Sequence, residues 1–157
     1  MAGSPRIASV TLDEHTVVRR SPEVEHERAV AIFDLLEDNH FAPHGDDRGP
    51  YRLHLAIVEN RLTIAIRADD GSELEGVALA LASFRRLVKD YFTVCDSYYA
   101  AIKRSSPARI EAIDMGRRGL HDEGAELLRQ RLADRVEIDF ATARRLFTLI
   151  CVLHIRG

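Results

Sequence analysis

Apolar and polar residues alternate most clearly between residues 51 and 82, where apolar side chains recur at every second position in three runs. The runs are Tyr51, Leu53, Leu55 and Ile57, then Leu62, Ile64 and Ile66, then Val77, Leu79 and Leu81. This period is typical of strands that bury one face, and Asn60 and residues 69–71 provide turn residues between the runs. We therefore predict a three-stranded antiparallel meander. Its polar positions are expected on a solvated face: Arg52, His54, Arg61, Thr63 and Arg67.

Elsewhere the apolar residues recur every three or four positions, which is the period of an amphipathic helix. The pattern predicts helices over residues 22–38, 84–104, 107–133 and 140–155. Ser21 before Pro22 and Ser106 before Pro107 are typical residues at the start of a helix.

Two of these helices carry further information in their apolar positions. In the first helix, Val30, Phe33 and Leu36 share one side, which is expected to be an apolar face. In the last helix, apolar residues surround nearly the whole circumference between residues 146 and 153. That distribution predicts a helix enclosed by other elements.

The remaining segments complete an α+β fold. Short alternating patterns predict strands near 7–13 and 136–139, which are candidates to extend the sheet. Residues 39–50 contain two prolines and two glycines without periodicity, so they are predicted to form a loop. We predict a single globular domain over residues 1–157, with residues 1–5 flexible and four or five helices packed on one face of the sheet.

Composition narrows the class of protein. The chain has 157 residues, of which 46% are hydrophobic and 30% charged, as in ordinary soluble domains. A net charge of −3 argues against a general nucleic-acid binder.

The start of the chain lacks the apolar run of a signal peptide, and the longest apolar stretch, LFTLICVLHI, is too short to cross a membrane. Cys95 and Cys151 lie in apolar helical patterns, so we expect buried, reduced thiols in a cytoplasmic protein without membrane contact.

One cluster of residue types suggests a metal site. His40, His44, Asp46 and Asp47 lie close together, and imidazole and carboxylate groups are common ligands of zinc and other divalent ions. Their spacing in a loop with proline does not bring the side chains to one face, as a helix would. An exposed polar loop is the alternative, and we predict no cofactor.

Arginine doublets suggest an anion-binding or partner-binding site, because guanidinium groups bind phosphates and carboxylates through paired N–H donors. The residues concerned are Arg85, Arg86 and Lys89, then Arg117, Arg118 and His121, then Arg144 and Arg145. A fourth doublet, Arg19–Arg20, precedes the first helix. The alternative is that each arginine pairs with a nearby acid, such as Arg118 with Asp122 one turn further on.

Catalytic signatures are missing from the chain, which contains no G-x-S-x-G elbow, phosphate-binding P-loop or dinucleotide-binding glycine motif. His121 has a side chain suited to acid–base chemistry, but Asp122 points about 100° away from it on a helix. The leading hypothesis is therefore a non-enzymatic regulatory or protein-interaction module, with self-association as a homodimer through helix faces. A small metal-dependent or acid–base enzyme and a phosphate or nucleic-acid binder are the alternatives.

The stretch MGRRGLHDEG contains Gly116, Gly119 and Gly124, which favour a break in a helix by propensity alone. The apolar register nevertheless continues across it, so we predict one helix, kinked near residues 116–119. This register places Gly116 and Gly124 where another helix packs closely. It places Arg117 and His121 on a more exposed side.

Four segments together resemble an uncharacterised protein family of alphaproteobacteria. They are TLDEHTVVRRSPEVEHERAVAIFDLLEDNHFAP, FRRLVKDYF, IEAIDMGRRGLHDEGAELLRQRL and DFATARRLFTLICVLH. The resemblance covers nearly the whole chain. It implies a cytoplasmic bacterial protein of one domain, and it implies no activity and no functional residue.

Overall fold

The computed structural model describes residues 3–13 and 22–153, which form four α-helices and six strands in an α+β fold. The strands are β1 (Ile7–Leu12), β2 (Phe41–Pro43), β3 (Tyr51–Val58), β4 (Arg61–Arg67), β5 (Val77–Ala80) and β6 (Val136–Ile138). The helices are α1 (Pro22–Glu37), α2 (Arg85–Arg104), α3 (Pro107–Leu132) and α4 (Phe140–Leu153), and a 3₁₀ turn (Leu81–Ser83) precedes α2. The predicted fold class is confirmed, and the predicted starts of the helices agree to within one residue.

The main sheet has the strand order β1-β3-β4-β5. The antiparallel meander of β3, β4 and β5 is confirmed, with Leu53 opposite Ile66 and Leu62 opposite Leu79. The strand predicted near 7–13 does extend this sheet as β1, but it pairs with β3 in the parallel direction, so the sheet is mixed. The chain passes through α1 between these two strands, and a crossover through a helix is the usual connection between parallel neighbours.

The strand near the C-terminus does not extend this sheet. β6 pairs antiparallel with β2, so that Phe41 lies opposite Ile138 and Pro43 opposite Val136. The prediction of a continuous loop over 39–50 is therefore wrong at β2. The pairing buries Phe41 completely, which explains how so short a strand is held without a periodic pattern of its own.

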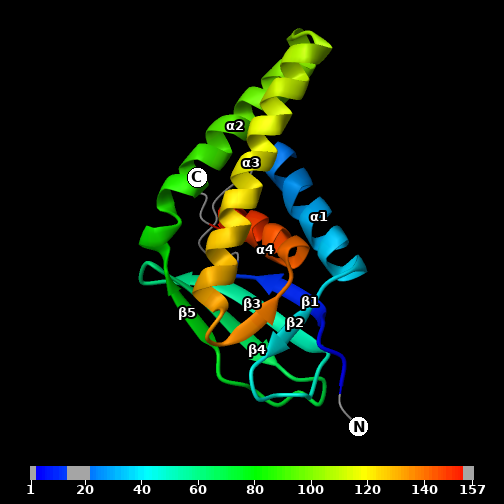
Figure 1. Cartoon of the computed structure of the whole chain (residues 1–157), viewed down its shortest axis with the longest axis vertical. Helices are drawn as coiled ribbons and strands as arrows, with labels where there is room; N and C mark the ends of the chain where they lie inside the picture. The colour runs from blue at the N-terminus through cyan, green and yellow to red at the C-terminus, as the bar shows by residue number, and fades with distance from the viewer. Residues whose placement is uncertain (1–2, 14–21, 154–157) are drawn as a thin grey trace.

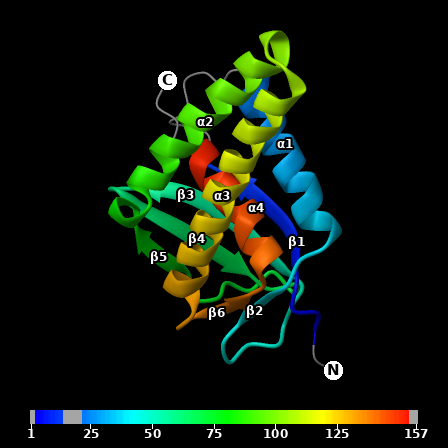
Figure 2. The same ribbon diagram turned by 45° about the horizontal axis from the view of Figure 1, so that its top comes forward.

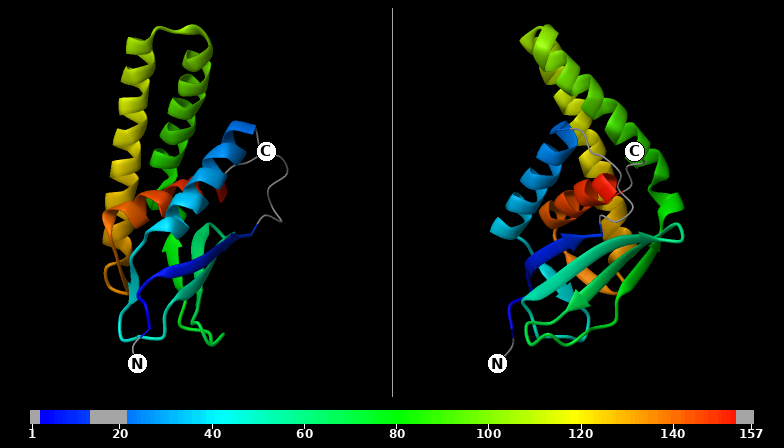
Figure 3. Two further views of the ribbon diagram at one scale, coloured as in Figure 1. Left: turned by 90° about the vertical axis from the view of Figure 1, so that its right-hand side faces the viewer. Right: turned by 180° about the vertical axis from the view of Figure 1, so that it is seen from behind.

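The helices lie on one side of the main sheet, as Figures 1 and 2 show. Residues that point to this side are buried, apart from the half-buried Ile57 and Leu79. On the other side Arg52, His54, Arg61 and Arg67 are exposed and Thr63 is half-buried, which confirms the expected solvated face. Figure 3 shows α2 and α3 side by side as a long hairpin that extends beyond the sheet, with α4 lying across its base.

α4 forms the centre of the core. Every residue from Leu146 to Leu153 is buried, which confirms the predicted enclosed helix. Contacts with α1, α3 and β3 cover α4 from several sides. Cys95 and Cys151 are buried free thiols, as predicted.

The predicted apolar face of α1 is wrong. Val30 and Phe33 are 40% and 65% exposed, whereas Ala31 and Leu35 are buried. The stripe that faces the core is thus displaced by one position from the predicted side, and Leu36 is only half-buried. The proposed N-cap Ser21 and the Arg19–Arg20 doublet lie outside the described residues.

The glycine-containing segment is helical throughout, because α3 runs without a break from Pro107 to Leu132. A Cβ atom on Gly124 would lie 2.5 Å from ring atoms of Phe147 in α4, so the predicted close packing is confirmed there. The same prediction is wrong for Gly116, where no atom of another described segment lies within 4 Å of the Cβ position. Gly119 is equally open.

This difference predicts opposite effects of alanine at two glycines of one helix. Gly124→Ala should lower the free energy of unfolding by about 1–3 kcal/mol, because the fully buried Phe147 ring must move. The matched control Gly119→Ala should raise it by about 0.5–1 kcal/mol, because alanine is the better helix former. Denaturant titration measures the two values, and a stabilising Gly124→Ala would contradict the packing.

Candidate functional site

A pocket of about 430 Å³ lies between α1, α2, α3 and α4, and we call it the interhelical pocket. It gathers ionisable side chains from segments far apart in the sequence. Those on its lining are His26, Glu27, Asp34, Arg117, Arg118, His121, Arg144 and Arg145. Val30, Ile102 and Tyr98 add apolar surface to the same lining.

Glu27 joins three of the helices around the pocket. Arg117 of α3 donates from Nη1 to Glu27 Oε1 at 2.8 Å, and Tyr99 of α2 donates its hydroxyl to the same oxygen at 2.7 Å. The side chains of Arg117 and Glu27 are only 20% and 13% exposed. Burial and the hydrogen bond to Glu27 raise the pKa of Tyr99, so its hydroxyl remains a donor. This shielded network holds α1 against the α2–α3 hairpin.

Asp114 offsets much of the positive charge that remains on the doublet Arg117–Arg118. Arg117 donates to Asp114 Oδ1 at 2.9 Å, and Arg118 lies 2.9 Å from Asp114 Oδ2. The Arg117 guanidinium also stacks over the Tyr98 ring, with its Cζ atom 4.5 Å from the ring centroid. The alternative that the arginines pair with nearby acids is thus confirmed for Arg117 and Arg118, but the acid is Asp114 on the preceding turn and not Asp122.

His121 faces inward, contrary to the expectation of a more exposed side for it and Arg117. Its ring stacks on Tyr91 with 5.2 Å between centroids. Among the described residues, its buried Nε2 atom has no hydrogen-bond partner. Burial, and then the positive charges of Arg144 and Arg117, lower the pKa of His121 to about 4. The ring is therefore neutral at physiological pH.

The acids next to His121 in the sequence turn elsewhere. Asp122 Oδ1 lies 3.3 Å from Arg144 Nε, and Glu123 accepts from Arg86 at 2.9 Å. Within the described segments no carboxylate therefore orients His121, as the divergence of adjacent helical side chains predicts.

The doublet of α4 carries the charge that is least offset. Arg145 donates from Nη1 to the Ala141 carbonyl oxygen at 3.1 Å, and its buried Nε atom has no hydrogen-bond partner in the segments that the structure describes. Within residues 3–13 and 22–153, no carboxylate forms an ion pair with Arg145. Arg144, by contrast, has Asp122 beside it.

The structure thus brings together Arg117, Arg118, His121, Arg144 and Arg145, and it separates them from the other candidate anion-binding residues. Arg85, Arg86 and Lys89 are exposed on α2 outside the pocket lining, and Arg86 is paired with Asp90 and Glu123.

Several lining residues are not among the candidates that the sequence predicts. They are Tyr98 and Tyr99 of α2 and Glu27 and Asp34 of α1. The helical spacing of Glu27 and Asp34, seven residues apart, was the one available sign that they share a face.

The candidate metal ligands do not meet. His40 Nε2 lies 3.0 Å from Glu137 Oε1, and His44 Nε2 lies 2.9 Å from the Ala133 carbonyl oxygen. Asp46 turns toward Arg48, and no contact joins Asp47 to the histidines. Nowhere in the described part of the chain do three or more histidine, cysteine, aspartate or glutamate side chains form a group that could hold a metal ion.

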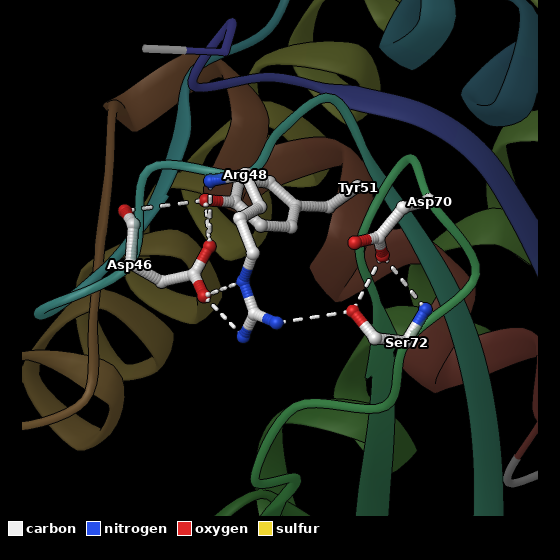
Figure 4. Close-up of polar contacts among 5 residues, drawn as sticks. All are labelled: Asp46, Arg48, Tyr51, Asp70 and Ser72. Carbon is white, nitrogen blue, oxygen red and sulfur yellow. Dashed lines mark hydrogen bonds and ion pairs between the residues drawn. The ribbon is translucent and has the colours of Figure 1, made fainter. Parts of the chain in front are cut away.

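Asp46 instead organises the loop before β3, as Figure 4 shows. Its carboxylate accepts from Arg48 Nε at 2.8 Å and from the Tyr51 hydroxyl at 2.8 Å. Arg48 reaches on to Ser72 Oγ at 3.0 Å, in the turn between β4 and β5. Burial and the bond to Asp46 raise the pKa of Tyr51 to about 12. Because all these polar groups bind one another, the cluster fastens two loops together.

The chain belongs to an uncharacterised protein family, UPF0262, whose model matches residues 4–156. A UPF0262 protein of Paramagnetospirillum magneticum is 59% identical, with 97% of each chain covered. One of Rhizobium leguminosarum bv. trifolii is 56% identical over 99% of each chain. One of Rhodopseudomonas palustris (strain BisB18) is 60% identical over 96% of this chain and 93% of its own. The resemblance to an alphaproteobacterial family is confirmed.

No solved structure matches the chain significantly. Of the helices in the described residues, none has both the length and the apolar character needed to span a membrane.

The burial of His121 predicts a loss of stability in acid. The unfolded side chain binds a proton below about pH 6.5, whereas the folded one does so only near pH 4. Between these values the unfolded state binds more protons, so the free energy of unfolding falls as pH falls, by about 3 kcal/mol in total.

Denaturant titrations of the wild type and of His121→Gln from pH 7.5 to pH 4 measure this contribution as the difference between two curves. The difference should appear below about pH 6.5 and level off near pH 4. Parallel curves across this range would contradict a buried neutral imidazole.

Proposed function

We propose that this protein is a non-enzymatic regulatory module that binds a small anionic ligand in the interhelical pocket. The observation that carries the proposal is the state of Arg145. This guanidinium lines the pocket without an ion-pair partner among the described residues, next to Arg144 in sequence and on the same lining as the unpartnered Nε2 of His121.

An anion would supply the missing partner. Guanidinium groups bind carboxylate and phosphate groups through two parallel N–H···O hydrogen bonds. Such charge-assisted hydrogen bonds are stronger than hydrogen bonds between neutral groups. Arg117 and Arg118 contribute less to binding, because Glu27 and Asp114 already occupy them.

Pocket size favours a small molecule. A volume of about 430 Å³ lies in the lower part of the range of about 300–1,000 Å³ found for small-molecule sites. Val30, Ile102 and Tyr98 provide apolar contact for the carbon atoms of such a ligand. The doublet at Arg85–Arg86 lies outside the pocket, so the arginines do not form one track for a nucleic-acid backbone.

Binding without chemistry is the simplest role for these side chains. A histidine whose pKa is about 4 is a weak general base at neutral pH, and no acid orients its ring. Burial raises the pKa of the Cys95 thiol to about 11, which disfavours the nucleophilic thiolate.

The cytoplasmic location and the homodimer stay predictions. The exposed side chains of Phe33 and Val30 on α1 offer an apolar surface for a protein contact.

Arg145→Gln tests the proposal directly. An NMR titration with n-propyl phosphate should shift signals of α4 residues in the wild type and show binding weakened about tenfold or more in the variant. The control Arg131→Gln removes the same charge from an exposed position outside the pocket and should bind as the wild type does. Added salt should weaken the binding.

Equal losses in Arg145→Gln and Arg131→Gln would reduce the effect to overall charge and refute a defined site. If neither n-propyl phosphate nor O-phosphoethanolamine, β-alanine or butyrate binds to the wild type, the proposed ligand-binding function is refuted.

A further inference from the structure

Asp34 is a second ionisable group in the interhelical pocket without an ionic partner. It is half-buried on α1 and lines the same pocket as Arg145 of α4. In the part of the chain that the structure describes, no side chain forms a hydrogen bond or ion pair with its carboxylate. Asp34 and Arg145 therefore share one pocket without neutralising each other at ion-pair distance.

The other acid on the lining differs in this respect. Glu27 accepts hydrogen bonds from Arg117 and Tyr99 at Oε1, and Arg117 offsets its charge within the protein. The acids Asp114 and Asp122 are likewise paired with arginines. The pairing thus leaves one carboxylate and one guanidinium in the pocket for groups that do not belong to the protein.

We infer that the ligand of the interhelical pocket is a small zwitterion, with a phosphate or carboxylate group at Arg145 and an ammonium group at Asp34. The inference rests on the proposed function and adds the second charge of the ligand. An ammonium group has three N–H donors and pairs well with a carboxylate. Val30 and Ile102 would contact the short aliphatic chain between the two charges.

Charge explains why a zwitterion fits better than a simple anion. An anion at Arg145 would be repelled by the half-buried Asp34 on the same lining, where screening by water is reduced. A ligand ammonium turns that repulsion into an attraction. A ligand with one carboxylate and one ammonium group has no net charge, which matches one acid and one arginine without ion-pair partners among the described residues of the lining.

Matched probes isolate the ammonium group. O-phosphoethanolamine and n-propyl phosphate have the same number of heavy atoms and differ by an ammonium in place of a methyl group. β-Alanine and butyrate form the corresponding carboxylate pair. Isothermal titration of the full chain should show that the zwitterion of at least one pair binds about tenfold or more tightly than its aliphatic partner. The pair that shows the preference identifies the anionic group.

Asp34→Asn separates the two readings of the pocket by the sign of its effect. If Asp34 binds an ammonium, the variant should lose the preference for the zwitterion and bind n-propyl phosphate at least as tightly as the wild type. The binding of n-propyl phosphate also shows that the variant is folded. The control Asp38→Asn removes the same charge one turn further along the chain, outside the pocket lining, and should keep the preference.

Three results would overturn the inference. Equal or tighter binding of both aliphatic probes in the wild type would leave a simple anion site, and the proposed function would stand. A preference that survives in Asp34→Asn would remove Asp34 from the site. Failure of all four probes to bind would overturn the proposed function together with the zwitterion.

Discussion

The burial of α4 on every side is the constraint on which the other elements depend. A helix with apolar residues around its circumference is stable in water only if neighbours cover all its faces, and each buried leucine, isoleucine or phenylalanine contributes about 1.5–3 kcal/mol. Here the sheet covers α4 from one side, while α1 and α3 cover others. α3 comes so near that a Cβ atom at residue 124 would lie 2.5 Å from the Phe147 ring, and Gly124 avoids this overlap.

The interhelical pocket follows from this arrangement. The buried part of α4 begins with Thr142 and Ala143, but the next two residues, Arg144 and Arg145, are charged and need a polar, water-accessible space. The interhelical pocket provides this space where α1 and the α2–α3 hairpin meet beside α4. The network of Glu27, Arg117 and Tyr99 holds these helices in place. A core helix thereby presents two guanidinium groups to a bounded space, which is the physical basis of the proposed ligand site.

Local patterns predict much of this architecture and fail where distant segments meet. The starts of the helices, the meander and the enclosure of α4 follow from periodicity alone. The parallel partner of β1 and the pairing of β2 with β6 do not, because pairing between residues 41–43 and 136–138 leaves no periodic signal in segments of this length.

The sequence predicts the wrong face of α1 because two apolar stripes lie one position apart on this helix. Packing against α4 selects Ala31 and Leu35 rather than Val30 and Phe33. Arg117 and His121 were expected outside, since a polar side chain gives no sign of the acid or ring that it meets inside. The convergence of two of the doublets is visible only once α3 and α4 are packed together.

The most direct test of the central claim is a crystal structure of the full chain grown with O-phosphoethanolamine, and a second one grown with β-alanine. For at least one of the two ligands we expect density for the anionic group within hydrogen-bond distance of the Arg145 guanidinium and for the ammonium beside Asp34. A direct ion pair between Arg145 and Asp34, with no ligand between the helices, would contradict it.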